Sequence, residues 1–170
     1  MKKIYCKIAL LLVLVSIVFL PFKRTEAKSE SDLSTAMNEL FDVVNDIIEK
    51  YSRMKKDACL LAELIYWENW YTDAERKTAR WTGAVVMNRV ESEEFPDSVE
   101  GVIYQTKPCK QYAVTGKFFT KELPREAYDM AWDILINGTP EVPKNVLYQA
   151  TFPQGKGEWK RLNGEVFCYG

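Results

Sequence analysis

Glu68 is the residue best placed to do chemistry, because it lies at the end of an apolar helical face. Spacings of three and four residues put Leu61, Leu64, Ile65 and Glu68 on the side of a helix that should face the core. A carboxylate there either reaches solvent at the helix end or lies in a partly dry pocket, where loss of water raises its pKa and makes it a usable proton donor. The pattern alone leaves both interpretations open.

Aromatic residues crowd the same helix end: Tyr66, Trp67 and Trp70. Aromatic faces suit the C–H faces of sugar rings, beside an acid that protonates a bridging oxygen. The simpler alternative is a set of core aromatics next to a surface glutamate. Glu63 is on the same helix, but on another face from Glu68.

The chain contains no histidine, which excludes the serine and cysteine triads that rely on imidazole and argues against a zinc hydrolase. It also has no glycine-rich phosphate loop. We therefore expect chemistry that runs on carboxylates and needs no metal and no cofactor.

Helical patterns position this site. Apolar residues recur at helical spacing over Leu33–Lys56, and Asp57 is placed to cap a second helix that ends near Trp70. A third helix follows to about Val90, with Thr72 and Glu75 at capping-box spacing.

The rest of the chain predicts two more helices and a small hairpin. Asp97 is placed to cap a short helix, and 105–121 has the aperiodic composition of a long surface loop. Pro124 and Gly138 bracket another helix. Two short strands, Val146–Phe152 and Val166–Tyr169, should form an antiparallel hairpin. The expected fold is mainly α with this small β-hairpin.

The N-terminal segment Met1–Ala27 has the layout of a secretory signal peptide: lysines, an apolar run over Ile8–Leu20, then polar residues. The run is shorter than the roughly 20 residues of a membrane span. The alternative is an uncleaved anchor that extends through Phe22. We expect the protein to associate with a membrane only through such an uncleaved N-terminus. The predicted domains are thus 1–27, an N-terminal amphipathic helix at 28–56 and a catalytic domain at 57–170.

Charge and cysteine content limit the partners. Loss of the lysine-rich signal leaves an acidic chain, which excludes nucleic acid as a partner. Cys6 would leave with the signal. An odd number of cysteines then remains, and since Cys59 fits a buried helix position, a Cys109–Cys168 disulfide is the expected pair. Three reduced thiols are the alternative.

The chain resembles the SleB-type cell-wall hydrolases, the family of the spore cortex-lytic enzymes. The resemblance covers about 61–170 and rests on collinear segments: LAELIYWENW, GAVVMNRV, FPDSVEGVIYQ, KQYAV, NVLYQATF and NGEVFCY. It implies a compact, mostly helical catalytic domain related to lysozymes and lytic transglycosylases, which cleaves peptidoglycan glycan strands. The single essential glutamate of the family matches Glu68.

The chain also departs from the family pattern. The residues on both sides of Glu68 differ from the family's Ala and Ala-Arg-Gly-Glu. The family's second acid has only Asp73 and Glu75 as candidates here, and Glu75 is better explained as a helix cap. Glu165 replaces a histidine that commonly precedes the last strand. The family's peptidoglycan-binding module has no counterpart.

The matched segments supply candidates for binding substrate. The residues expected to line the sugar groove are Tyr66, Trp67, Gln105, Gln111, Tyr112 and Tyr148. Tyr104 should belong to the core. Asn88 and Arg89 should hold their helix end against the next turn.

With one convincing acid, a lytic transglycosylase fits better than a two-carboxylate hydrolase. Glu68 would protonate the leaving glycosidic oxygen and then deprotonate the muramyl C6 hydroxyl. We expect a secreted monomer associated with wall or spore. Two alternatives stay open: a peptidoglycan-binding module with impaired catalysis, and an interaction protein that docks through the Leu33–Lys56 helix.

Overall fold

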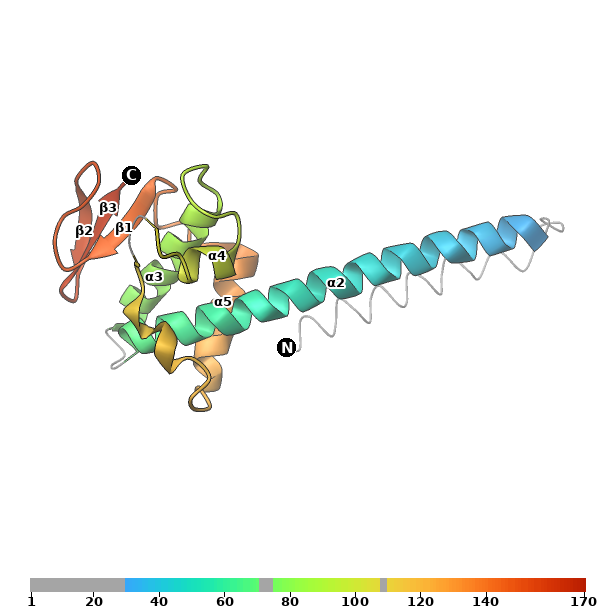
Figure 1. Ribbon diagram of the computed structural model, residues 1–170, viewed down its shortest axis with the longest axis horizontal. Coiled ribbons are helices and arrows are strands. Elements are labelled where there is room, and N and C mark those ends of the chain that lie inside the picture. Colours follow the sequence, from blue (N-terminus) through green and yellow to red (C-terminus); the bar gives the residue numbers. More distant parts are fainter. Residues whose placement is uncertain (1–29, 71–74, 108–109) are drawn as a thin grey trace. The chain divides into compact units, whose positions relative to one another are not determined.

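The computed structural model describes residues 30–70, 75–107 and 110–170 (Figure 1). The predicted signal peptide, including Cys6, lies outside these residues. The chain divides into two compact units, with the boundary between Ile47 and Ile48, earlier than the predicted boundary after Lys56. None of the described helices is long and apolar enough to cross a membrane.

Helix α2 (Glu30–Asn69) is continuous across the predicted break at Asp57. The prediction of a cap at Asp57 was therefore wrong. Neither glycine nor proline occurs between Glu30 and Asn69, so nothing in the sequence interrupts the backbone hydrogen bonds. The first part of the helix exposes its apolar stripe: Met37, Phe41, Val43, Val44, Ile47, Ile48 and Tyr51.

Helix α3 (Glu75–Val90) ends at the predicted residue, and α4 (Val99–Ile103) follows a turn. Ser98 caps α4, since its hydroxyl accepts the Gly101 N–H at 3.2 Å, and the prediction of an Asp97 cap was one residue off.

Helix α5 (Arg125–Asn137) lies between Pro124 at the N-cap and Gly138 at the C-cap, as the bracketing residues predict. Gly138 has a φ of 69°, a conformation that favours glycine. The predicted long loop between α4 and α5 contains a short 3₁₀ helix, η2 (Ala113–Lys117).

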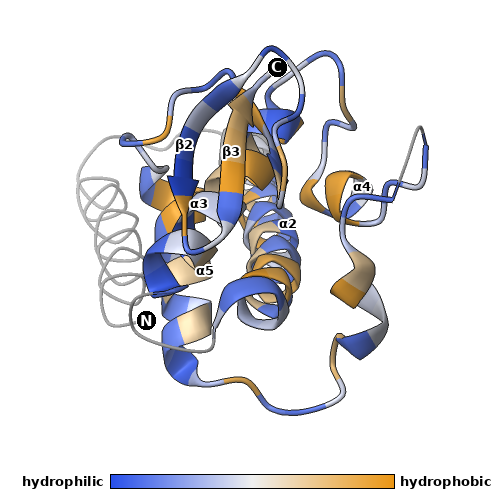
Figure 2. Ribbon diagram, turned by 90° about the vertical axis from the view of Figure 1, so that its left-hand side faces the viewer, coloured by the Kyte–Doolittle hydropathy of each residue, from blue (hydrophilic) through white to orange (hydrophobic). Residues whose placement is uncertain are grey.

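Three strands form one antiparallel sheet in the order β1-β3-β2, instead of a two-stranded hairpin. They are β1 (Val146–Ala150), β2 (Glu158–Leu162) and β3 (Glu165–Tyr169). Strand β2 was missed because three of its five residues, Glu158, Lys160 and Arg161, are charged, and its two apolar residues, Trp159 and Leu162, do not alternate. In Figure 2 it is hydrophilic, whereas β3 is hydrophobic and buried. Asn163 and Gly164, with φ of 50° and 85°, form the two-residue turn between β2 and β3.

Two apolar clusters hold the domain together. The larger one joins the C-terminal part of α2 to α3, α4 and α5, and Leu61, Leu64 and Ile65 contribute fully buried side chains to it. The smaller one packs α3 on the sheet, where the Trp81 and Phe167 rings meet edge to face at 5.2 Å. The architecture confirms the expected mainly helical fold with a small antiparallel sheet, and α3 connects all its parts.

Candidate active site

Glu68 is half-buried in the last turn of α2. Burial raises the pKa of its carboxyl from 4.5 to about 7, and repulsion by Glu165 adds to the rise, while the Lys117 ammonium opposes it. The carboxyl is thus partly removed from water, although Glu68 lines neither of the two cavities described below.

Two asparagine side chains bring the segments carrying Glu68 and Glu165 onto one face of α3. Asn69 Nδ2 donates to Thr82 Oγ1 at 2.9 Å, and Asn163 Nδ2 donates to Thr78 Oγ1 at 2.8 Å. The two threonines are one helical turn apart, and Thr82 Oγ1 also donates to the Thr78 carbonyl at 3.0 Å. The end of α2 and the β2–β3 turn therefore share one anchor.

Glu165 is a functional candidate that sequence reasoning recorded only as a departure from the family. It is the first residue of β3 and is half-buried. No local pattern marks it, because its neighbour Glu68 is far away along the chain. The one available signal was the position itself, where the family usually has another titratable residue.

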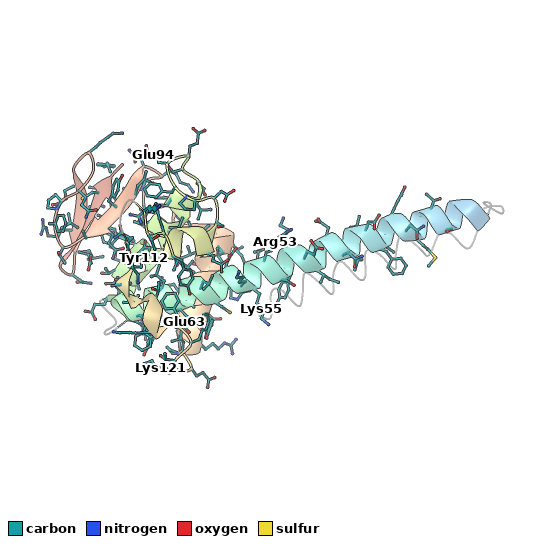
Figure 3. The ribbon with its side chains drawn as sticks, in the orientation of Figure 1. Arg53, Lys55, Glu63, Glu94, Tyr112 and Lys121 are labelled. Atoms are coloured by element: carbon teal, nitrogen blue, oxygen red, sulfur yellow. The ribbon has the colours of Figure 1, made fainter. Side chains whose placement is uncertain are left out.

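Two lysines lie over the predicted sugar-stacking aromatics, Tyr66 and Trp67. One of them, Lys121, is labelled in Figure 3 together with Glu63 of α2. Lys117 Nζ lies 5.4 Å from the centre of the Trp67 ring. Lys121 Nζ lies 4.5 Å from the Tyr66 ring centre and 4.7 Å from that of Trp67. Lys121 Nζ also donates to the Tyr66 hydroxyl at 2.6 Å. A sugar could stack on these faces only by sharing them with the ammonium groups.

Glu63, which the sequence places on another face of the helix from Glu68, is buried, with 1% of its surface exposed. Its Oε2 accepts the Trp67 indole N–H at 2.9 Å. This hydrogen bond satisfies a buried acceptor and fixes the Trp67 ring one turn away on the helix. Glu63 therefore orients an aromatic residue of the site.

Three predicted groove residues, Gln105, Gln111 and Tyr148, line one cleft of about 250 Å³ together with Arg89 and Phe95. Arg89 is 1% exposed, and its guanidinium lies 4.9 Å from the Phe95 ring centre and 5.7 Å from that of Tyr148. Gln111 Oε1 accepts from Arg89 Nη2 at 2.8 Å. The cleft therefore has a rigid, positively charged base under a polar rim.

Two tyrosines lie differently from the prediction. Tyr112 is 2% exposed, so its ring belongs to the core and cannot stack on substrate. Among the described residues its buried hydroxyl has no hydrogen-bond partner. Burial raises the pKa of Tyr112, the Arg89 guanidinium opposes the rise and the Glu68 carboxylate adds to it. Tyr104, predicted as core, is 43% exposed.

Asn88 and Arg89 attach α3 to the sheet rather than to the next turn. Asn88 Nδ2 donates to the carbonyls of Pro143 and Val146 at 2.9 and 3.0 Å. Arg89 Nε donates to the Leu147 carbonyl at 2.6 Å. The pair fixes β1, and with it Tyr148, relative to α3.

Of the candidate second acids, Asp73 lies outside the described residues, as does the predicted cap Thr72. Glu75 is the first residue of α3, with one carboxylate oxygen buried and without a hydrogen-bond partner among the described residues. No group of three metal-ligating side chains occurs in the part of the chain that the structure describes.

The structure shows a free thiol at one end of the predicted Cys109–Cys168 pair. Cys168 is a free, buried cysteine, and its sulfur accepts the Gln154 N–H at 3.3 Å, while Cys109 lies outside the described residues. Cys59 is also free, and it is half-buried instead of fully buried. The sequence gives the positions of the three cysteines but not the distances between their sulfur atoms, so it could not decide which of them form a disulfide.

A larger cavity of about 530 Å³, between α3 and the segment from α5 to β1, contains none of the predicted site residues. Its carboxylate, Glu91, is ion-paired with Lys144 at 2.6 Å. Glu68 therefore remains the candidate catalytic residue.

Comparisons with known proteins agree with this architecture. The crystal structure of the catalytic domain of the Bacillus cereus SleB protein matches with a TM-score of 0.51 and 23% identity, over 66% of this chain and 88% of that one. No match was found among curated proteins. A family model described as Cell Wall Hydrolase matches residues 73–167, which starts after Glu68 and includes Arg89 and Glu165. Because this match spans more than half of the sequence, the chain belongs to the cell wall hydrolase family.

Proposed function

We propose that this cell wall hydrolase cleaves the glycan strands of peptidoglycan as a lytic transglycosylase, with Glu68 as the catalytic acid and base. The observation that carries the proposal is the half-buried Glu68 carboxyl, whose pKa is raised to about 7 in a fold shared with a SleB catalytic domain. A group with this pKa is available both as an acid and as a base near neutral pH.

The reaction needs one carboxyl that gives a proton and takes one back. Protonated Glu68 donates to the glycosidic oxygen, and the bond from that oxygen to the anomeric carbon breaks. The Glu68 carboxylate then accepts the proton of the muramyl C6 hydroxyl, while the oxygen of that hydroxyl forms a bond to the anomeric carbon. The product is a 1,6-anhydromuramyl end, and Glu68 returns to its protonated form.

Glu165 supports this scheme through its charge. The transition state of glycosidic cleavage has oxocarbenium character, with positive charge near the anomeric carbon. A carboxylate held on β3, close enough to repel Glu68, would stabilise that charge. The anchors of Asn69 and Asn163 on α3 keep the two acids at a fixed separation.

The same pair of acids favours a second candidate, hydrolysis. In that scheme Glu68 protonates the leaving oxygen while Glu165 takes a proton from the attacking water, so the product ends in a reducing sugar. The two candidates share Glu68 and differ in whether Glu165 is required.

The test is digestion of insoluble peptidoglycan by the purified protein, with mass spectrometry of the released muropeptides. Anhydro ends indicate a transglycosylase, and reducing ends indicate a hydrolase. Binding without release would indicate a binding module, and neither binding nor release would refute the proposal.

Glu68→Gln should lower release by about 10²- to 10⁴-fold. Glu93→Gln, which changes an exposed acid in the turn after α3, is the matched control and should cleave normally. Full activity of Glu68→Gln would exclude Glu68 as the catalytic group. Glu165→Gln should abolish reducing ends in the hydrolytic scheme, and it should only slow the formation of anhydro ends in the transglycosylase scheme.

A further inference from the structure

Resting on the proposed function, we propose that Lys117 and Lys121 form a subsite beside Glu68 that binds a carboxylate on the muramyl side chain of the glycan strand. This lysine subsite would make the enzyme select strands by the charge that muramyl residues carry. The proposal stands on the placement of the two ammonium groups, on their lack of ion pairs and on their position relative to Glu68.

The two ammonium groups are held in place before any ligand binds. Lys121 Nζ contacts the Tyr66 and Trp67 rings at 4.5 and 4.7 Å from their centres and donates to the Tyr66 hydroxyl at 2.6 Å. Lys117 Nζ lies over the Trp67 ring at 5.4 Å. The indole is itself fixed by Glu63. Cation–π contacts restrict the long side chains, so less entropy remains to be lost on binding.

Neither lysine forms an ion pair with a carboxylate of the described residues. Other lysines of the domain do so at short distance: Lys56 with Glu100 and Lys144 with Glu91, each at 2.6 Å. Lys117 and Lys121 are exposed. Their charges are therefore available to an anionic group from solution.

The lysine subsite lies near Glu68 rather than on a remote surface, because both ammonium groups lie over the ring of Trp67, the residue that precedes Glu68. Lys117 is close enough to Glu68 to oppose the rise of its pKa, and Trp67 precedes Glu68 in α2. Glu165 acts on the same carboxyl from β3. The environment of Glu68 thus includes a cationic group at η2 and an anionic group at β3.

Peptidoglycan supplies the complementary group at the right place. The muramyl residue carries a lactyl substituent that ends either in a free carboxylate or in an amide to a stem peptide with its own carboxylates. Two ammonium groups over the same Trp67 ring supply the positive charge that attracts such a carboxylate. A neutral muramyl side chain would gain nothing from this subsite.

The experiment measures cleavage kinetics on three soluble strand preparations. The first carries stem peptides, the second has been stripped to free lactyl groups by an amidase, and the third has all its carboxylates amidated. The variants are Lys121→Gln and the double variant Lys117→Gln/Lys121→Gln. Lys156→Gln is the control, an exposed lysine between β1 and β2.

We expect Lys121→Gln to raise KM about fivefold on carboxylate-bearing strands, with kcat nearly unchanged, and the double variant to raise KM further. On amidated strands the KM of each variant should equal that of the wild type. A KM penalty on stripped strands alone identifies the lactyl carboxylate, and a penalty on intact strands alone identifies the stem peptide. The penalty should shrink at high salt.

Equal KM values for Lys121→Gln, the double variant and the wild type on all three preparations would overturn the lysine subsite while leaving glycan cleavage intact. An equal KM increase on amidated strands would also overturn it, because the lysines would then act without a carboxylate. Failure of the proposed function is distinct, since the wild type would then release no product from any preparation.

Discussion

Replacing Glu68 with glutamine should stabilise the folded protein at pH 8 and leave its stability near pH 4 almost unchanged. The folded-state pKa of Glu68, about 7, lies above the ordinary value of 4.5 that the unfolded chain should show. Below pH 4.5 the carboxyl is protonated in both states. As pH rises through 4.5 toward 7, the unfolded state loses its proton more readily, so the wild type loses stability across this interval.

The magnitude follows from the size of the pKa difference and from exposure. A rise from 4.5 to about 7 corresponds to about 3 kcal/mol for a fully buried group. Because Glu68 is only half-buried, solvent screening reduces this to about 1 to 2 kcal/mol. For a domain of this size, the melting temperature of Glu68→Gln at pH 8 should exceed that of the wild type by roughly 3 to 6 °C.

Urea unfolding followed by far-UV circular dichroism at pH 4, 6 and 8 measures the effect, with Glu93→Gln as the control for removing an exposed charge. The difference between Glu68→Gln and the wild type should grow with pH and level off above pH 7. A difference that is the same at pH 4 and pH 8 would refute the reasoning, because Glu68 would then be as well solvated in the folded protein as in the unfolded chain.

Three further predictions concern the neighbours of this site. Glu165→Gln should shift the alkaline limb of kcat/KM for glycan cleavage to lower pH, and Lys117→Gln should shift it to higher pH; identical limbs would show that neither charge acts on Glu68. Arg89→Met removes two hydrogen bonds from a buried position and should cost about 2 to 4 kcal/mol of unfolding free energy by urea titration, whereas a loss below about 0.5 kcal/mol would contradict the role assigned to it. Asn163→Ala should be less stable than Asn163→Gly by roughly 1 to 2 kcal/mol in the same assay, because the turn requires a positive φ, and equal stabilities would contradict this.

Local patterns predicted most of the fold, because the forces behind them act over a few residues. Pro124 and Gly138 marked both ends of α5, and helical spacing identified the buried face of α2 that carries Glu68. The errors came from signals that compete with one another. Asp57 is a residue type that often caps helices. Because no glycine or proline interrupts the chain nearby, α2 continues through it. Strand β2 was missed although Asn163 and Gly164, a typical hairpin turn, directly follow it.

The site was less predictable, because its members come from distant segments. The collinear resemblance identified Gln105, Gln111 and Tyr148, and the structure brings these three to one cleft. The resemblance could not show which aromatic residues keep a free face. Tyr112 is buried in the core. The ammonium groups of Lys117 and Lys121 lie over the Trp67 ring, and they come from the segment that the sequence predicted to be a long surface loop.

The charge of Glu165 raises the pKa of Glu68. A histidine at this position, as the resembling family commonly has, would be neutral or positive and could not repel an ionised Glu68. A carboxylate there disfavours ionisation of Glu68 and, with burial, keeps it protonated to a higher pH. Lys117 limits this effect, so the carboxyl can still lose its proton during the reaction. In the proposed mechanism, in which Glu68 acts first as an acid and then as a base, both influences are needed, and the charges of Glu165 and Lys117 would together set the pH range in which it does both.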